Sequence, residues 1–133
     1  MTVVGNNLYA VGGFDDSLPL DSVEIYNPGG EWKFVASMTI SRGGVGAASM
    51  GGHVWAVGGH NGSQYLNSVE CYSPLTNQWQ MVSSMGTPRA GAGVASCLCD
   101  VEIIRKAQDS LSVTHVKEEG EKEGEQEING APL

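Results

Sequence analysis

The chain has 133 residues, 19 of them glycine, and a formal net charge of −8, which opposes binding to the phosphate backbone of nucleic acids. Most of this charge belongs to the carboxy-terminal end: residues 1–99 carry six acidic and three basic side chains, and residues 100–133 carry nine and four. The sequence has no apolar run long enough to cross a membrane and no secretion-signal layout at its amino terminus, so we expect a cytoplasmic protein, with a nuclear location as the alternative.

The first 92 residues contain one pattern twice. The apolar run 8–11 and the glycine pair that follows it return 46 residues later at 54–59, and the segment 22–26 returns as 68–72. Repetition at a period of about 40 to 50 residues is typical of propeller blades or solenoid turns, whose single units cannot bury their own apolar surface. The chain is therefore expected to be a scaffold of copies, with function in the places where the copies differ.

Each copy predicts four strands. From the innermost to the outermost they are expected at 1–4, 8–11, 23–26 and 31–34 in the first copy, and at 45–50, 54–57, 69–72 and 78–81 in the second. The innermost strands are rich in small residues, which suits a place where neighbouring blades converge, whereas the third and fourth strands alternate apolar and polar residues. We expect the recurring aromatic residues to lie in the core: Tyr26, Trp32, Tyr72 and Trp79.

An apolar run ending in Gly-Gly, then Glu-x-Tyr, then a single Trp, at this period, resembles the Kelch repeat, a four-stranded blade of a β-propeller. The glycine-rich runs 11–16, 42–46, 57–62 and 89–94 look most like the carboxy-terminal end of a Kelch-like (BTB-Kelch) protein. The resemblance implies an all-β fold of an incomplete, six-bladed type of propeller. Its parts would be two four-stranded Kelch blades at 1–44 and 45–92, a closing inner strand at 93–99, and a disordered acidic tail at 100–133.

Two blades cannot close a ring, because propellers have four to eight blades and repeat arrays generally need at least three units. From the alignment of the two copies we expect residues 1–4 to be the second half of an innermost strand, and the BTB and BACK domains that the resemblance implies are not expected within these 133 residues. We therefore expect a fragment whose blade faces are open to water. Such a chain should be unstable, prone to aggregation or dependent on another chain.

Catalytic chemistry finds little support. Cys71 and Cys97 stand at apolar strand positions, where a free thiol behaves as a small hydrophobic group, and no histidine pair has the spacing of metal ligands. The Gly-x-Gly runs at 44–46 and 91–93 precede strands instead of a helix, which excludes a dinucleotide-binding loop. We expect no cofactor, no metal, no catalytic residues and no enzyme activity.

A recognition surface is expected instead, at the loops 14–20 and 60–66, which differ between the copies. The resemblance implies that the residue after Gly-Gly and the arginine before the inner strand line a partner-binding mouth. With the neighbouring loop residues, the candidate partner-binding residues are Phe14, Asp15, Asp16, Arg42, His60, Asn61, Tyr65 and Arg89. An equal alternative for both arginines is a scaffold role, in which they hold a backbone carbonyl or the carboxylates of Glu24 and Glu70 inside the blade. For Asp15 and Asp16 the alternative is turn formation.

Three function classes compete. The resemblance to Kelch-like proteins implies the substrate-recognition propeller of a cullin-3 RING ubiquitin ligase, in which the propeller holds a protein substrate, such as an acidic peptide segment, and a BTB domain holds cullin-3. Other Kelch proteins bind actin, which gives the alternative of a cytoskeletal module. The weakest reading is a copper enzyme similar to galactose oxidase, because the sequence lacks a Tyr/His ligand cluster.

Overall fold

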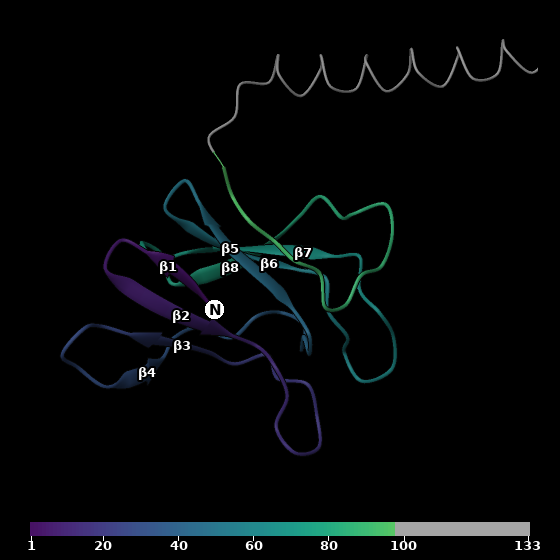
Figure 1. The fold of residues 1–133 in the computed structure, drawn as a ribbon, viewed down its shortest axis with the longest axis horizontal. Coiled ribbons are helices and arrows are strands. Elements are labelled where there is room, and N and C mark those ends of the chain that lie inside the picture. The colour runs from purple at the N-terminus through teal and green to yellow at the C-terminus, as the bar shows by residue number, and fades with distance from the viewer. Residues whose placement is uncertain (98–133) are drawn as a thin grey trace, which may run out of the picture. The chain divides into compact units, whose positions relative to one another are not determined.

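The structure, a computed structural model, describes residues 1–97 (Figure 1). This part of the chain folds into two antiparallel sheets of four strands. The first sheet contains β1 (Thr2–Val4), β2 (Asn7–Val11), β3 (Val23–Tyr26) and β4 (Trp32–Phe34), in that spatial order. The second contains β5 (Gly46–Met50), β6 (His53–Val57), β7 (Val69–Ser73) and β8 (Gln78–Val82). No helix that could span a membrane occurs within residues 1–97.

The predicted fold class of two four-stranded blades is confirmed, and no strand boundary differs from the predicted one by more than a residue. The predicted closing strand is not seen in residues 93–97, which have no regular structure. An innermost strand forms its ladder with the second strand of its own blade, and residues 1–97 supply no such strand for this segment. The rest of that strand and the predicted acidic tail lie outside the described residues.

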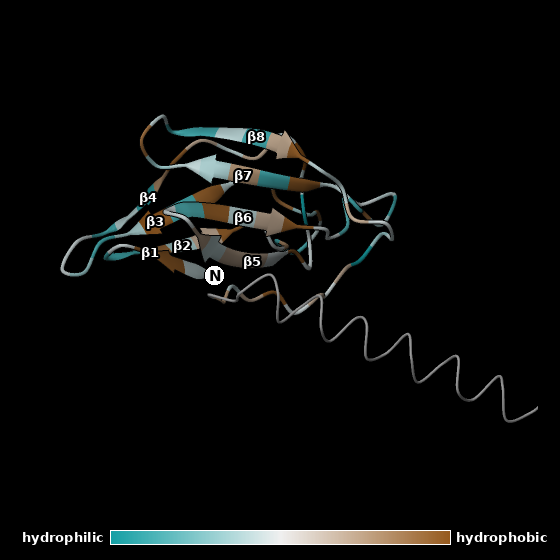
Figure 2. Ribbon diagram, turned by 90° about the horizontal axis from the view of Figure 1, so that it is seen from above, coloured by the Kyte–Doolittle hydropathy of each residue, from teal (hydrophilic) through white to brown (hydrophobic). Residues whose placement is uncertain are grey.

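Strand pairing gives each sheet two distinct faces. Tyr9 pairs with Ile25 and Val11 with Val23, so their side chains share one face of the first sheet. Glu24 pairs with Ala10 and lies on the opposite face. The outer strand β8 runs from polar to apolar residues, whereas β1 is largely apolar (Figure 2).

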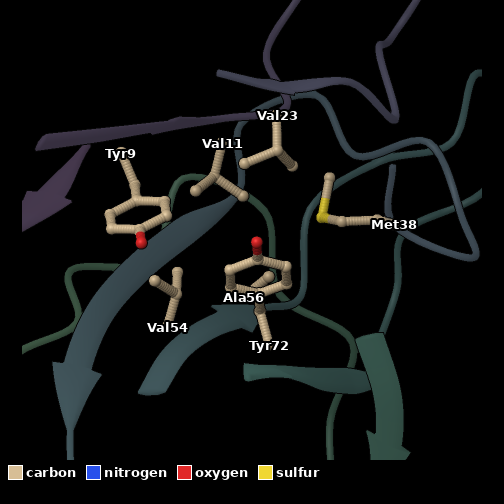
Figure 3. Close-up of a cluster of buried hydrophobic side chains, with 7 residues drawn as sticks. All are labelled: Tyr9, Val11, Val23, Met38, Val54, Ala56 and Tyr72. Atoms are coloured by element: carbon tan, nitrogen blue, oxygen red, sulfur yellow. The ribbon is translucent and has the colours of Figure 1, made fainter. Parts of the chain in front are cut away.

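The core lies between the two sheets, where the first face of one blade meets the opposite face of the next. Seven buried side chains converge there (Figure 3): Tyr9, Val11, Val23 and Met38 from the first blade, and Val54, Ala56 and Tyr72 from the second. The rings of Tyr9 and Tyr72 are 5.9 Å apart between centroids, at 59°. Burial raises the pKa of both phenols, as expected for polar groups enclosed by apolar neighbours.

Polar contacts also join the blades at their outer strands. The indole Nε1 of Trp79 donates to the carbonyl of Ala36 at 2.8 Å. The Oδ1 of Asn77 accepts the N–H of Ala36 at 3.0 Å and the hydroxyl of Tyr72 at 2.9 Å. Asn77 adopts a φ of 52°, in the left-handed region that asparagine tolerates better than most residues. One turn residue therefore connects β7, β8 and the first blade.

Three of the four aromatic residues expected in the core are not fully buried. Tyr72 is buried and Trp79 half-buried, but their counterparts in the first copy, Tyr26 and Trp32, are half-buried and 43% exposed. Each Tyr–Trp pair has a similar tilted geometry, with centroids 5.2 Å apart in the second blade and 5.3 Å in the first. The prediction for Trp32 was wrong because its face of the first sheet points away from the second sheet, and the Tyr26 ring packs against the indole there.

Candidate partner-binding site

The two loops between second and third strands share one internal architecture. In the β2–β3 loop, the Oδ1 of Asp15 accepts the backbone N–H groups two and three residues further on, at 2.8 and 2.7 Å. In the β6–β7 loop, the Oδ1 of Asn61 accepts the equivalent pair at 3.0 and 2.9 Å. Aspartate and asparagine fix tight turns by bonding their own following backbone. Both loops are therefore held in a defined shape by their second residue.

The two loops lie side by side at one end of the blades (Figure 1). Gly43 and His60 exchange backbone hydrogen bonds, both at 2.8 Å, which ties the second loop to the end of the first blade. The ring of Phe14 rests on Gly43, where a Cβ would lie only 2.1 Å from a ring carbon. Only glycine permits this approach. Phe14 and His60 are thus brought to the same edge of the molecule.

We call the exposed side chains of these loops the aromatic loop surface: Phe14, Leu18, His60 and Tyr65. Phe14 is 59% exposed and Tyr65 is 65% exposed, while His60 is half-buried and packs against the Tyr65 ring with centroids 5.1 Å apart at 68°. Aromatic side chains on rigid loops offer large contact area at small cost in side-chain entropy, and such residues are enriched in protein interfaces. The surface is suited to recognition.

Arg42 lies elsewhere, in the interior between the blades. Arg42 and Glu70 both have 0% side-chain exposure and form a salt bridge of 2.9 Å, with the guanidinium also donating to the carbonyl of Gly58 at 2.8 Å. Ser68 accepts two further bonds, at its carbonyl and its hydroxyl, 2.9 and 3.0 Å away. Thr39 completes the site by donating its N–H and hydroxyl to Glu70 at 2.8 and 2.7 Å. Arg42 has no surface to offer a partner, so the prediction that it lines a binding mouth is corrected in favour of the scaffold alternative.

Comparison with known proteins agrees with this geometry. The model of the Kelch motif matches residues 1–39 and 41–86, more than half of the chain. The chain belongs to the Kelch-repeat family. Kelch repeats build β-propeller modules for protein interaction, and the two sheets are two such blades. A search among curated proteins finds no match.

The remaining predicted contacts fall on or beside the second-to-third-strand loops of the two Kelch blades. Asp15 and Asn61 serve as the turn formers described above, and Asp16 is exposed at the tip of the first loop. Hydrogen bonds from the N–H groups of Leu18 and Ser17 lower the pKa of Asp15. Whether these polar residues also contact a partner stays a prediction.

Arg89 occupies in the second Kelch blade the backbone place that Arg42 occupies in the first. Its carbonyl accepts the N–H of Gly59 at 2.7 Å, as the carbonyl of Arg42 accepts that of Gly13 at 2.9 Å. Unlike Arg42, Arg89 is exposed. Among residues 1–97, the Arg42–Glu70 pair is the salt bridge that forms, and Arg89 takes part in none. The two arginines therefore share their backbone hydrogen bonds and differ in the burial of their side chains.

Sequence reasoning missed three residues. Leu18 is 64% exposed in the aromatic loop surface, although its loop was recognised as apolar-edged. Ser68 and Thr39 bind the buried ion pair; the recurrence of Ser22 as Ser68 was visible, but recurrence alone does not show which atoms a side chain meets.

The described part of the chain, residues 1–97, holds no group of three metal-ligating side chains. Cys71 is half-buried, and burial raises the pKa of its thiol, which keeps it protonated and weakly reactive. Cys97, expected at an apolar strand position, is exposed because its segment forms no strand.

Proposed function

We propose that this chain is a protein-binding module that captures a protein substrate through its aromatic loop surface. The observation that carries the proposal is the position of Phe14 and Tyr65, both more than half exposed on loops fixed by internal hydrogen bonds. Large aromatic side chains held open to solvent have no role in the core of their own blade. They are suited to enclose apolar side chains of a partner segment.

The groups around this surface suggest a partner segment that carries both apolar and charged side chains. Asp15 and Asp16 lie beside Phe14 in the first loop, whereas His60 and Tyr65 offer ring N–H and hydroxyl groups in the second. A peptide with an apolar side chain between the rings, and a carboxylate near His60 and Tyr65, would meet each group with suitable chemistry. This preserves the acidic substrate segment expected from the sequence and keeps His60 as its contact, without Arg42.

In the cell, we propose that this capture serves a cullin-3 RING ubiquitin ligase in the cytoplasm. The glycine-rich runs of the repeats resemble those of BTB-Kelch proteins, Kelch-like protein 8 among them, and that resemblance supports the proposal. Cullin-3 itself would be contacted by a BTB domain and not by these residues. Binding of filamentous actin is the competing function, and it would use the same propeller.

The test compares the full chain with the double variant His60→Ala/Tyr65→Ala. Proteins cross-linked in cells by the wild type but not by the variant are candidate substrates, and at least one should accumulate when cullin-3 is depleted. Leu75→Ala is the matched control, since Leu75 is 97% exposed on the β7–β8 turn, outside the loops. Cosedimentation with filamentous actin, lost in the double variant, would favour the cytoskeletal function. Equal capture by wild type and variant would refute the site.

A further inference from the structure

The residues that join the two blades recur in the repeat, and their equivalents take no part in this contact. Arg42 reaches from the first blade into acceptors on the second: the Gly58 carbonyl, Ser68 and Glu70. The first blade carries the same acceptors, because Gly12, Ser22 and Glu24 stand 46 residues earlier. The second blade carries the same donor in Arg89. Among residues 1–97 neither half of this second set has a salt-bridge partner.

Side chains at the contact between the blades are also more buried than their equivalents outside it. Tyr9, Val11 and Met38 are buried against the second blade, but their counterparts Trp55, Val57 and Met85 are only half-buried. We call this side of the second blade the Arg89 face.

On the opposite side of the first blade, side chains are less buried than their equivalents in the second blade. Ala56, Glu70 and Tyr72 are buried, whereas the residues 46 positions earlier are half-buried. We call this side the Glu24 face; it consists of Leu8, Ala10, Glu24, Tyr26 and Trp32.

A hollow on the Arg89 face shows where the outer strands would meet. It has a volume of about 320 Å³ and is lined in part by Cys71, Gln80 and Val82. The equivalent place on the first blade, at Ile25, Val35 and Ala36, packs against the shared core, and Trp79 of the second blade donates to the Ala36 carbonyl. The counterpart of Trp79 is Trp32, which is 43% exposed. The exposed indole of Trp32 and the hollow beside Cys71 therefore stand at positions equivalent to the two sides of the existing contact between Trp79 and the first blade.

We infer that two copies of this chain bind head to tail, the Arg89 face of one against the Glu24 face of the other. Arg89 forms the salt bridge with Glu24 of the second copy and donates to the Gly12 carbonyl and Ser22 there. Trp32 of the second copy fills the hollow beside Cys71. One bond of the contact between the two blades is lost, because the position of Thr39 is taken by Gly86, which has no hydroxyl. Arg89 then serves this interface instead of the substrate contact predicted from the sequence.

The contact is heterologous, so each copy keeps one face free for the next copy until a ring closes. Propellers have four to eight blades and residues 1–97 of each copy contribute two, so closure from these blades needs about two to four copies. The aromatic loop surfaces of successive copies would then lie along one rim, as the two loops within one copy already do. This inference does not depend on which protein the rim binds.

The test uses charge reversal of both partners in the full chain. Sedimentation velocity should show wild-type assemblies of about two to four copies. Arg89→Glu alone and Glu24→Arg alone should each weaken self-association about tenfold or more, because each places like charges at the interface. An equimolar mixture of the two variants should restore assembly, since every contact between unlike copies is again oppositely charged. Lys33→Glu and Asp16→Arg are the matched controls on exposed residues and should assemble as wild type.

Circular dichroism of each variant distinguishes lost assembly from lost folding, since both residues are at most half-buried in the single copy. The mixture remains decisive in either case, because misfolded variants do not rescue one another. A monomeric wild type, assembly unaffected by either reversal, or a mixture that stays monomeric would each overturn the inference.

Discussion

At the scale of the residue, burial decides what an arginine does. Arg42 and Arg89 occupy equivalent positions in the repeat and make the same backbone hydrogen bonds to the loop glycines, although Arg42 lies between Ser41 and Gly43 and Arg89 between Pro88 and Ala90. Arg42 is enclosed with Glu70 by the second blade, whereas Arg89 meets solvent. A buried ion pair recovers its desolvation cost only when every polar group is bonded, and among residues 1–97 no buried side-chain nitrogen or oxygen lacks a partner. The pair therefore fixes the spacing between blades.

Arg42→Ala should lower the free energy of unfolding by about 3–5 kcal/mol, because Glu70 would remain buried without its counter-charge. Arg89→Ala is the matched control and should change the unfolding of the single copy by less than about 0.5 kcal/mol. Urea denaturation at protein concentrations low enough to exclude self-association measures both. Similar losses in the two variants would show that the buried pair does not hold the blades together.

At the scale of the element, the strands could be predicted from the sequence because the same apolar periodicity occurs in both copies of the repeat. Val23–Tyr26 and Val69–Ser73 alternate in the same phase, and the structure forms both as third strands. Sequence also placed the loops at the end of the blades. It could not assign Arg42 to the interior, because recurrence is equally expected of a residue that binds and of a residue that supports.

The limits of the sequence are clearest at Trp32 and at residues 93–97. Trp32 carries the pattern of a core aromatic residue, yet its burial depends on a blade that must pack over it. Residues 93–97 have the composition of an inner strand, but a strand forms only with a hydrogen-bonded neighbour. Local pattern specifies which residues are able to be buried, and the neighbouring element decides whether they are.

The turn that Asp15 forms in the β2–β3 loop should respond to acid, whereas the turn that Asn61 forms in the β6–β7 loop has no carboxylate to protonate. Backbone hydrogen bonds lower the pKa of Asp15 from its ordinary value of 3.8, so the ionised carboxylate stabilises the folded turn. This contribution is complete above the unfolded pKa and is lost as the pH falls through the lowered pKa of the folded state. The equivalent acceptor in the other loop, Asn61, does not titrate.

Amide chemical shifts between pH 2 and 5 provide the measurement. The Leu18 amide should titrate with a midpoint below 3.8, the Gln64 amide should stay constant, and Asp15→Asn should remove the Leu18 transition. A Leu18 midpoint at or above the ordinary value, or an equal response of both loops, would contradict the role given to Asp15.

At the scale of the whole molecule, stability and assembly are linked. Residues 1–97 bury one inter-blade core and leave the Arg89 and Glu24 faces uncovered, so a single copy has the benefit of one interface for two blades. Repeat arrays gain much of their stability from contacts between neighbouring units. Whatever covers the open faces binds the folded chain and not the unfolded one, and mass action then stabilises the folded chain.

The melting temperature of the wild type should therefore rise with protein concentration, by on the order of 4 °C for each tenfold increase. Trp32→Ala leaves the hollow beside Cys71 unfilled, and Arg89→Glu places a carboxylate against Glu24, so the melting temperature of either variant should rise less with concentration than that of the wild type. Leu75→Ala should follow the wild type, since that side chain is 97% exposed on a turn. Scans over a hundredfold range of concentration separate the cases. A constant wild-type value would mean that the faces stay open to water, and the single inter-blade core would then have to account for the stability of the chain alone.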